Sequence, residues 1–154
     1  MMIYWFGFVP AGWETVAAAT IMAVSLYTFA NAGMKTSDYY FSGFPALWNL
    51  VVLCFHVLQT GPWINLTVIG VCAVLTFVPF KYVHPFRVTD WRKVTIPMTV
   101  LWAATSLRLV LIDPAAGKAI EASPLIFWLW VMASAYFVVL SLWRSFRPDP
   151  SEAP

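Results

Sequence analysis

Long apolar segments recur along this chain and constrain its fold more than any other feature. A helix needs roughly 17 to 25 mostly apolar residues to cross a lipid bilayer. Lipid offers no hydrogen-bond partners, so a spanning segment must pair its backbone groups internally, as a helix does. Five segments meet this length and predict an all-α, polytopic transmembrane helix bundle with five full spans: residues 14–31, 43–60, 63–81, 94–112 and 124–143.

The composition favours a membrane protein and excludes several other classes. The chain is 61% hydrophobic and 10% charged, and its mean hydropathy is +0.76. A soluble chain of 154 residues could not bury this much apolar surface, because small domains leave much of their surface exposed. The net charge of +2 is too small to indicate a nucleic-acid partner. Cys54 and Cys72 lie in different apolar segments, which predicts buried thiols without a metal or a disulfide.

The two ends of the chain differ from the five long segments. Residues 1–9 are apolar but too short to span a bilayer, and Pro10 follows them, so we expect the outer half of a further helix. Residues 1–9 show neither a basic leader nor a cleavage pattern, so we do not expect a signal peptide there. The tail at residues 147–154 is polar and rich in proline, which predicts disorder. Residues 1–146 are therefore predicted to form a single membrane domain.

The basic residues predict how the helices are oriented across the membrane, because lysine and arginine concentrate in cytoplasmic connections. If the connections at 32–42 and 81–93 and the C-terminus are cytoplasmic, seven of the nine Lys and Arg residues lie on that side. The other two are Lys118, in an outer connection, and Arg108, near the outer end of its helix. The pattern predicts a cytoplasmic C-terminus.

The connection at residues 31–49 holds more chemistry than a simple turn requires. It contains the cation Lys35, the acid Asp38 and a run of aromatic residues that begins with Tyr39 and Tyr40. A connection that only reverses the chain needs a few polar residues. This segment is therefore a candidate binding surface on the cytoplasmic side.

Its glycines and its proline also have a structural interpretation. Gly33 is a candidate C-cap for the helix before it, since glycine accepts the left-handed conformation that often ends helices. Ser42 is a candidate N-cap for the next helix, with Gly43 and Pro45 in its first turn. This interpretation leaves the charged residues and the tyrosines of the same segment unexplained.

The second candidate surface is the segment KYVHPFRVTDWRK at residues 81–93. Lys81, His84 and Arg87 recur at every third position, so on a helical turn they would share one face and could hold phosphate oxygens. A basic segment that only contacts anionic lipid headgroups would have the same pattern. Both interpretations remain open at the level of sequence.

No reaction centre can be recognised from the residues alone. No acidic residue lies well inside a predicted span, and no two have the spacing of a metal site on one helix. The chain contains no Gly-rich phosphate loop, no H-E-x-x-H and no G-x-S-x-G motif. No charge lies in the middle of a predicted span, which makes a transporter the weaker alternative.

Two long segments carry a resemblance to a known family. The segments GMKTSDYYFSGFPALWN, residues 33–49, and LTFVPFKYVHPFRV, residues 75–88, are similar to bacterial phosphatidylcholine synthases, a branch of the CDP-alcohol phosphotransferase family. Their order matches the family, and the similarity extends along the whole membrane region. The resemblance implies a transferase of phospholipid biosynthesis in the bacterial inner membrane, which often forms homodimers.

The activity that the resemblance implies is transfer of the phosphatidyl group of CDP-diacylglycerol to choline, with release of CMP. In the family this in-line displacement is assisted by Mn²⁺ or Mg²⁺, held by the aspartates of a D-G-x-x-A-R segment followed by G-x-x-x-D-x-x-x-D. No Asp-Gly pair and no Ala-Arg pair occurs in this chain. Pro10-Ala11 resembles the far end of the helix that follows this motif. We therefore expect no metal ligands or catalytic residues here, and an inactive C-terminal portion of the enzyme.

Charge and shape assign hypothetical substrate-binding roles to both segments. Cationic side chains are candidates for the diphosphate of the liponucleotide, and aromatic rings are candidates for a cage around the quaternary ammonium of choline. The alternative to an enzyme portion is a non-enzymatic membrane bundle that binds lipid or acts as a scaffold. The candidates are Lys35, Asp38, Tyr39, Tyr40, Phe41, Trp48, Lys81, His84 and Arg87.

Overall fold

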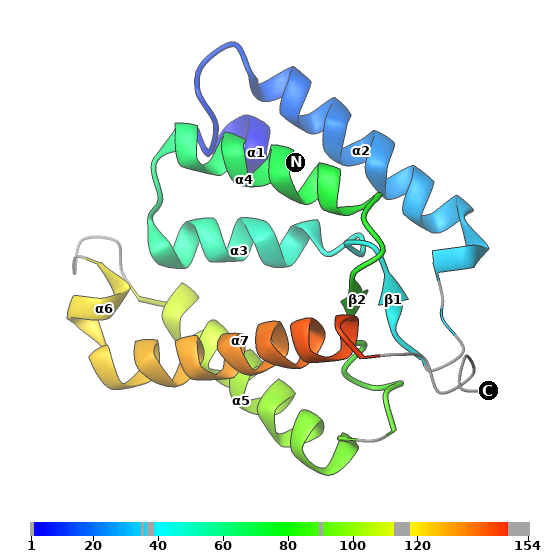
Figure 1. Cartoon of the computed structure of the whole chain (residues 1–154). Helices are drawn as coiled ribbons and strands as arrows, with labels where there is room; N and C mark the ends of the chain where they lie inside the picture. Colours follow the sequence, from blue (N-terminus) through cyan, green and yellow to red (C-terminus); the bar gives the residue numbers. More distant parts are fainter. Residues whose placement is uncertain (1, 35, 37–38, 90, 113–117, 148–154) are drawn as a thin grey trace.

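The structure is a computed structural model, and it describes residues 2–34, 36, 39–89, 91–112 and 118–147. This part of the chain is mostly helical, with one short strand pair at one end (Figure 1). The long helices are α2 (Glu14–Ala30), α3 (Trp48–Leu58), α4 (Pro62–Leu75), α5 (Arg92–Val110) and α7 (Pro124–Ser145). The short elements are α1 (Met2–Trp5), η1 (Ala32–Met34), β1 (Phe41–Ser42), β2 (Lys81–Tyr82) and α6 (Ala119–Ala122).

The first core of the molecule joins α2, α3 and α4 to the N-terminal segment. Ala17 of α2, Phe55 of α3 and Ile69 of α4 are buried in it. Asn65 of α4 is also buried, and its Nδ2 donates a hydrogen bond of 2.8 Å to the carbonyl of Phe8. A buried amide needs such a partner, so Asn65 attaches the N-terminal segment to the start of α4.

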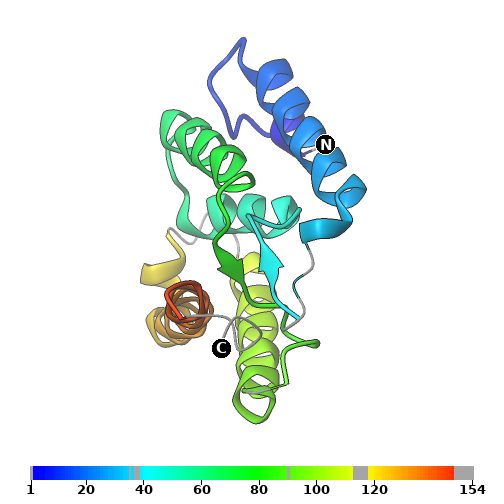
Figure 2. The ribbon, with the colours of Figure 1, turned by 45° about the vertical axis from the view of Figure 1, so that its right-hand side comes forward.

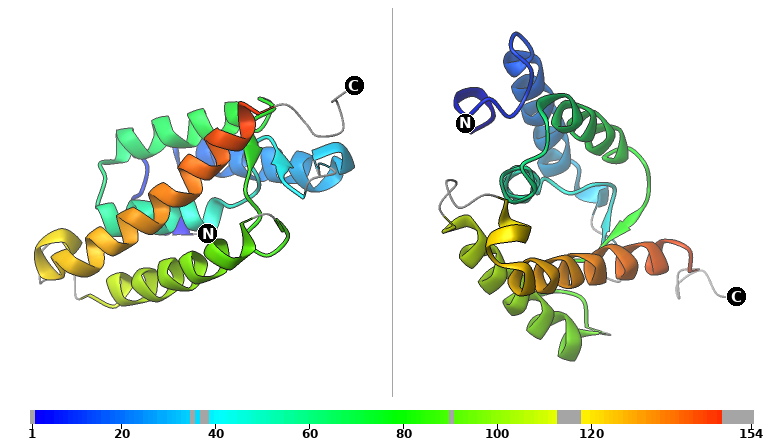
Figure 3. Two further views of the ribbon diagram at one scale, coloured as in Figure 1. Left: turned by 60° about the horizontal axis from the view of Figure 1, so that its bottom comes forward. Right: turned by 90° about the vertical axis from the view of Figure 1, so that its left-hand side faces the viewer.

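Helices α5 and α7 lie side by side and form the second part of the bundle (Figure 3). Hydrogen bonds between side chains join them at successive levels, and in transmembrane proteins such bonds average roughly 0.6 kcal/mol each. Buried tryptophans usually find a partner for the indole N–H in this way. The bonds are Trp130 Nε1 to Ser106 Oγ at 2.9 Å, Trp102 Nε1 to Ser134 Oγ at 2.9 Å, and Thr95 with Tyr136 through hydroxyls 2.8 Å apart.

Helix α3 connects the two parts of the bundle. Its residue Val57 is buried in a second core with Leu109 of α5 and Trp130 of α7. The opposite face of α3 contributes Val52 to the first core. Apart from one exposed side with Asn49 and His56, α3 is apolar, so it can pack against both cores.

The two strands are antiparallel neighbours, although they are far apart in sequence (Figure 2). Phe41 pairs with Tyr82, and Ser42 pairs with Lys81. The end of α7 supports this pair, because the backbone N–H of Lys81 donates to Oγ of Ser145 at 2.8 Å. The strand pair therefore links the connection before α3 to the connection after α4 and to the C-terminal helix.

The strand pair shows that the predicted boundaries at residues 43–60 were wrong. The helix begins at Trp48 rather than at residue 43. Gly43 adopts a φ of +89° and donates its backbone N–H to the carbonyl of Phe80 at 2.8 Å, so its hydrogen bond goes to another segment. Ser42 belongs to β1 and caps no helix. The all-α prediction is corrected accordingly to a mostly helical fold with a short strand pair.

Two further boundaries differ for related reasons. The helix predicted at 63–81 ends at Leu75, because Pro79 has no N–H to donate and disfavours helix in the residue before it. Gly33 is not the C-cap of α2: Asn31 is, and its Oδ1 accepts the N–H of Gly33 at 3.0 Å within η1. The helices predicted at 14–31, 94–112 and 124–143 lie within two residues of α2, α5 and α7.

The ends of the chain were predicted less well. The expected half-helix at residues 1–9 is a four-residue helix, α1, which a turn follows with Gly7 at a φ of +62°. The tail predicted to be disordered lies, from residue 148 on, outside the described residues.

Helix length tests the prediction of five complete spans. In the described residues one helix, α7, is long and apolar enough to cross a membrane by length and composition. The apolar helices α2, α3 and α4 have 17, 11 and 14 residues. At 1.5 Å per residue α3 rises roughly 17 Å, against about 30 Å for the hydrocarbon core of a bilayer. Five full spans are therefore not confirmed.

Candidate functional site

The strand pair brings the two predicted binding segments into contact. Residues 39–42 and 81–87 are separated by about forty positions in sequence, yet β1 and β2 join them at one end of the bundle (Figure 1). Aromatic and basic side chains of the two segments thereby meet in pairs, and α7 adds one further arginine. We call these residues the strand-pair site: Tyr39 with Arg87, Phe41 with His84, and Tyr40 with Arg144.

Two contacts join the first segment to the second. The ring of Phe41 stacks on the imidazole of His84, with centroids 5.5 Å apart and an interplanar angle of 26°. The guanidinium carbon of Arg87 lies 5.8 Å from the ring centroid of Tyr39. A cation over an aromatic face contributes roughly 0.5 to 1 kcal/mol at exposed sites. Both Tyr39 and Arg87 are exposed, so the guanidinium is oriented by the ring and still accessible to a ligand.

Arg144 is a member of the site that sequence reasoning treated only as a cytoplasmic charge. It lies in the last turn of α7, is 6% exposed, and its guanidinium carbon is 5.6 Å from the ring centroid of the buried Tyr40. Its Nη1 donates to the carbonyl of Arg147 at 3.2 Å. Leu140, one helical turn before Arg144, packs in the same cluster as Tyr40. The spacing of four residues between Leu140 and Arg144 places both on one face of α7. The sequence alone does not tell which face of α7 points inward, so this spacing was not enough to predict that Arg144 is buried.

Trp48 lies apart from the other predicted aromatic residues. It begins α3, is buried in the first core, and contacts Phe44 edge-on with centroids 5.4 Å apart. Phe44 in turn meets Tyr82 of β2 at 5.6 Å. Burial raises the pKa of the Tyr82 phenol, so this ring stays neutral at physiological pH. Trp48 thus contacts the strand pair indirectly: it packs on Phe44, and Phe44 packs on Tyr82 of β2.

The remaining predicted residues are placed as follows. Lys81 begins β2 and is partly buried. Lys35 and Asp38 lie outside the described residues, so the structure does not place them. The expectation that Lys81, His84 and Arg87 share one face of a helical turn was wrong, because Lys81 is in a strand and only the segment after it turns.

His84 has a lowered pKa. Partial burial removes water from the ring and is the larger cause, and the nearby positive charge of Arg87 acts in the same direction. The backbone N–H of Phe86 donates to Nδ1 at 3.3 Å, which a neutral imidazole can accept. Because the pKa in the folded chain lies below that of the unfolded chain, the neutral ring favours the folded state above pH 6.5 and this contribution is lost as the pH falls.

We predict that the imidazole of His84 titrates with a midpoint below 6.5 in the folded chain, and that Arg87→Gln raises this midpoint because it removes a neighbouring cation. Proton NMR of the histidine ring signals as a function of pH measures both values. The chain has two histidines, so His56→Gln assigns the signals. A midpoint that stays the same or falls in Arg87→Gln contradicts the proposed proximity of the two side chains.

The described residues do not fit a divalent metal ion. None of their His, Cys, Asp and Glu side chains form a group of three or more that could hold one. Glu14 and Glu121 are the acidic residues within the described ranges, and they lie at the start of α2 and in α6, which are both distant from the strand pair (Figure 1). The divalent cation that the resemblance implies therefore has no ligand set in this part of the chain, and we derive no step through it.

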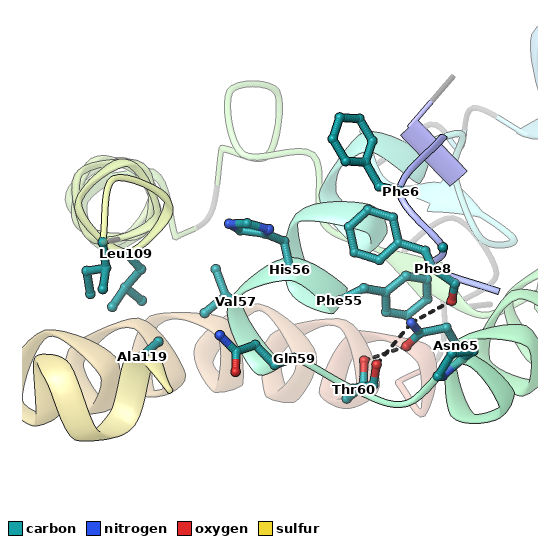
Figure 4. Close-up of a pocket in the computed structure, with 13 residues that line it drawn as sticks. Phe6, Phe8, Phe55, His56, Val57, Gln59, Thr60, Asn65, Leu109 and Ala119 are labelled. Carbon is teal, nitrogen blue, oxygen red and sulfur yellow. Dashed lines mark hydrogen bonds between the residues drawn. The ribbon is translucent and has the colours of Figure 1, made fainter. Parts of the chain in front are cut away.

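A cavity of about 380 Å³ lies at the other end of the bundle, at the turn between α3 and α4 (Figure 4). Phe8, Phe55 and His56 are among the residues that line it. Its most buried polar side chain, Asn65, is satisfied within the protein: it donates to Phe8, and its Oδ1 accepts a hydrogen bond from the hydroxyl of Thr60. Asn65 and Thr60 thus hold the turn and the N-terminal segment together, which is a structural role.

The fold and the site define a mostly helical protein with many exposed apolar side chains and a basic, aromatic site at one end. No family model and no solved structure matches the chain. Its curated relatives are named phosphatidylcholine synthase. The chain is 41% identical to the phosphatidylcholine synthase of Pseudomonas aeruginosa over 147 residues. The matched region covers 96% of this chain and 59% of the relative.

Two other relatives agree. The phosphatidylcholine synthase of Rhizobium johnstonii is 32% identical over 146 residues, or 95% of this chain and 58% of the relative. That of Mesorhizobium japonicum is 40% identical over 102 residues, or 66% of this chain and 38% of the relative. The chain is thus a homologue of bacterial phosphatidylcholine synthases, which confirms the resemblance. It spans less than two thirds of the length of these relatives.

Proposed function

We propose that this chain is the membrane-embedded, substrate-binding portion of a phosphatidylcholine synthase. The complete enzyme would transfer the phosphatidyl group of CDP-diacylglycerol to the hydroxyl of choline and release CMP. Homology to proteins of that name supports the proposal. The single observation that carries it is the pairing of β1 with β2, because this pairing joins the two segments on which the resemblance depends into one site.

The chemistry of the strand-pair site favours the anionic part of the liponucleotide. CDP-diacylglycerol carries a diphosphate, and arginine binds phosphate oxygens through two parallel hydrogen bonds. Arg87 is exposed and oriented by Tyr39, so its guanidinium can do this without a large loss of side-chain entropy. In this proposal the described residues bind and orient the substrate. The metal ion and the base would come from another part of a longer synthase.

A choline cage built from the same aromatic residues has less support. The ring of Tyr39 already faces Arg87 at 5.8 Å, and the ring of Tyr40 faces Arg144 at 5.6 Å. A second cation on these rings would meet like charge. Trp48 lies behind the strand pair in the first core. The ammonium group of choline is therefore expected to bind outside the faces that these arginines occupy.

The placement in the membrane belongs to the same proposal. Five spans in the bacterial inner membrane, with the strand-pair site and the C-terminus on the cytoplasmic side, agree with the distribution of lysine and arginine. The short helices α3 and α4 would complete their crossings with the apolar residues next to them, such as 43–47 and 76–80. A homodimer is the expected assembly, and Mn²⁺ or Mg²⁺ the expected cofactor of the complete enzyme.

The test is to measure binding and turnover separately with the purified chain in detergent micelles. We expect the chain to bind CDP-diacylglycerol, measured by isothermal titration, and to release no CMP when choline and Mn²⁺ are added. The reason is that no Asp-Gly or Ala-Arg pair is present to supply the metal-binding motif. Turnover by the chain alone would contradict the account of its missing catalytic residues, and absence of binding would contradict the proposed substrate.

A non-enzymatic lipid-binding bundle is the second candidate, because the exposed helix faces are strongly apolar. It would bind phospholipids without regard to the cytidine diphosphate group. Equal affinity for CDP-diacylglycerol and phosphatidylglycerol in the same titration would favour this candidate.

A further inference from the structure

A small pocket of about 200 Å³ lies where α2 and α4 end, next to β1. We call it the helix-end pocket. Pockets for drug-sized ligands have volumes of roughly 300 to 1,000 Å³, so this one suits a ligand of only a few non-hydrogen atoms. Residues that line it include Tyr27, Asn31, Met34, Ser42, Thr76 and Phe77.

Two aromatic rings line the helix-end pocket and contact each other. The ring centroids of Tyr27 and Phe77 are 4.9 Å apart, and the interplanar angle of 44° means that the rings are tilted rather than stacked. Both side chains are exposed, so a ligand can reach them. The hydroxyl of Tyr27 accepts a hydrogen bond of 3.1 Å from Nδ2 of Asn31, which orients the Tyr27 ring. Aromatic faces attract cations.

The ends of two helices place negative partial charge at the same pocket. The last carbonyl groups of a helix together carry roughly half a negative charge. Asn31 is the C-cap of α2 and Thr76 is the C-cap of α4, and both line the pocket. No lysine or arginine is among the described residues that line it, and Lys81, which pairs with Ser42 across the strands, is not one of them. The helix-end pocket therefore favours a small cation.

Strand β1 separates the helix-end pocket from the strand-pair site. Ser42 lines the pocket, whereas its neighbour Phe41 stacks on His84. Successive side chains of a strand point to opposite faces. The two sites have opposite preferences, because arginines lie over the tyrosine rings of the strand-pair site and the two rings of the helix-end pocket have no such partner among its described lining residues.

We propose that the helix-end pocket binds the quaternary ammonium group of choline. The inference rests on the proposed function for the identity of the ligand, and it places that ligand away from the rings of Tyr39 and Tyr40. A trimethylammonium group combines positive charge with an apolar surface, which suits aromatic rings beside helix carbonyl groups. A primary ammonium is more strongly hydrated, so the pocket would select choline over ethanolamine.

Isothermal titration of choline chloride into the purified whole chain in detergent micelles tests this inference. The neutral probe is 3,3-dimethylbutan-1-ol, which has the shape of choline without its charge. We expect choline to bind about tenfold more tightly than the neutral probe. Phe77→Leu should weaken choline binding by about threefold or more, because it removes one of the two rings.

The matched control is Phe29→Leu, which makes the same change at an exposed position of α2 outside the pocket lining. It should leave the affinity for choline unchanged. Equal affinities of Phe77→Leu and Phe29→Leu, or of choline and the neutral probe, would overturn the inference, and binding of CDP-diacylglycerol to the same chain would still support the proposed function. Binding of tetramethylammonium that depends on Phe77, without binding of choline, would contradict choline both as the ligand of this pocket and as the proposed substrate.

Discussion

Gly43→Ala is expected to destabilise the strand pair and the fold by roughly 2 to 6 kcal/mol, because it adds backbone strain to a steric clash. Gly43 has a φ of +89°, a conformation that residues with a side chain rarely adopt. A Cβ atom there would lie 2.3 Å from the carbonyl oxygen of Thr76 and 3.0 Å from the terminal methyl of Met34. The carbonyl belongs to backbone that connects α4 to β2, so it cannot move without disturbing the pairing.

Unfolding of the purified variant in detergent, followed by circular dichroism against a denaturant, measures this effect. The matched control is Gly70→Ala in α4, where a Cβ atom would meet no atom within 4 Å. Alanine in a helix interior is favoured over glycine, so the control should be neutral or slightly stabilising. Equal stability of Gly43→Ala and the unmodified chain would show that residues 41–44 do not approach α4 as closely as described.

Arg87→Gln is expected to weaken binding of CDP-diacylglycerol by about tenfold or more. Hydrogen bonds to charged groups contribute about 1.5 to 3 kcal/mol, and each 1.4 kcal/mol corresponds to a factor of ten in affinity. The substitution keeps a polar side chain of similar length and removes the cation that lies over Tyr39. Isothermal titration of the liponucleotide into the chain in detergent micelles measures the change.

Lys118→Gln is the matched control, because it removes the same charge at the N-cap of α6, at the opposite end of the bundle (Figure 1). The affinity of the Lys118→Gln variant for CDP-diacylglycerol should equal that of the unmodified chain. Thermal unfolding separates binding from folding, since Arg87 is exposed and its loss should change stability little. An affinity that falls equally in both variants would indicate general attraction between charges rather than a site at Arg87.

Periodicity and length predicted the helices that depend on local sequence, and failed where the chain pairs with distant residues. Helices α2, α5 and α7 appear within two residues of their predicted bounds. The predicted helix at 43–60 lost its first turn because the backbone of Gly43 bonds to Phe80, a partner that no local pattern reveals. Apolar residues next to a helix look like a continuation of it, whatever their hydrogen bonds are.

The sequence named residues of the candidate site but not their contacts. It left Tyr39 and Tyr40 unexplained by a turn and made Arg87 a candidate for phosphate oxygens, and the structure places Arg87 over Tyr39 and Arg144 over Tyr40. It did not predict that arginines would lie over the tyrosines, because cation–π pairs form between segments that are distant in sequence. Arg144 was missed for the same reason.

The two-residue strand pair also limits how this chain can change in length. Surface connections usually tolerate added or deleted residues. Successive residues of a strand point to opposite sides, so a single insertion before Phe41 would direct its ring away from His84 and place a neighbour there instead. The connections on both sides of β1 and β2 are thus under a constraint on residue number as well as on residue type, whereas the turn between α3 and α4 pairs with no strand.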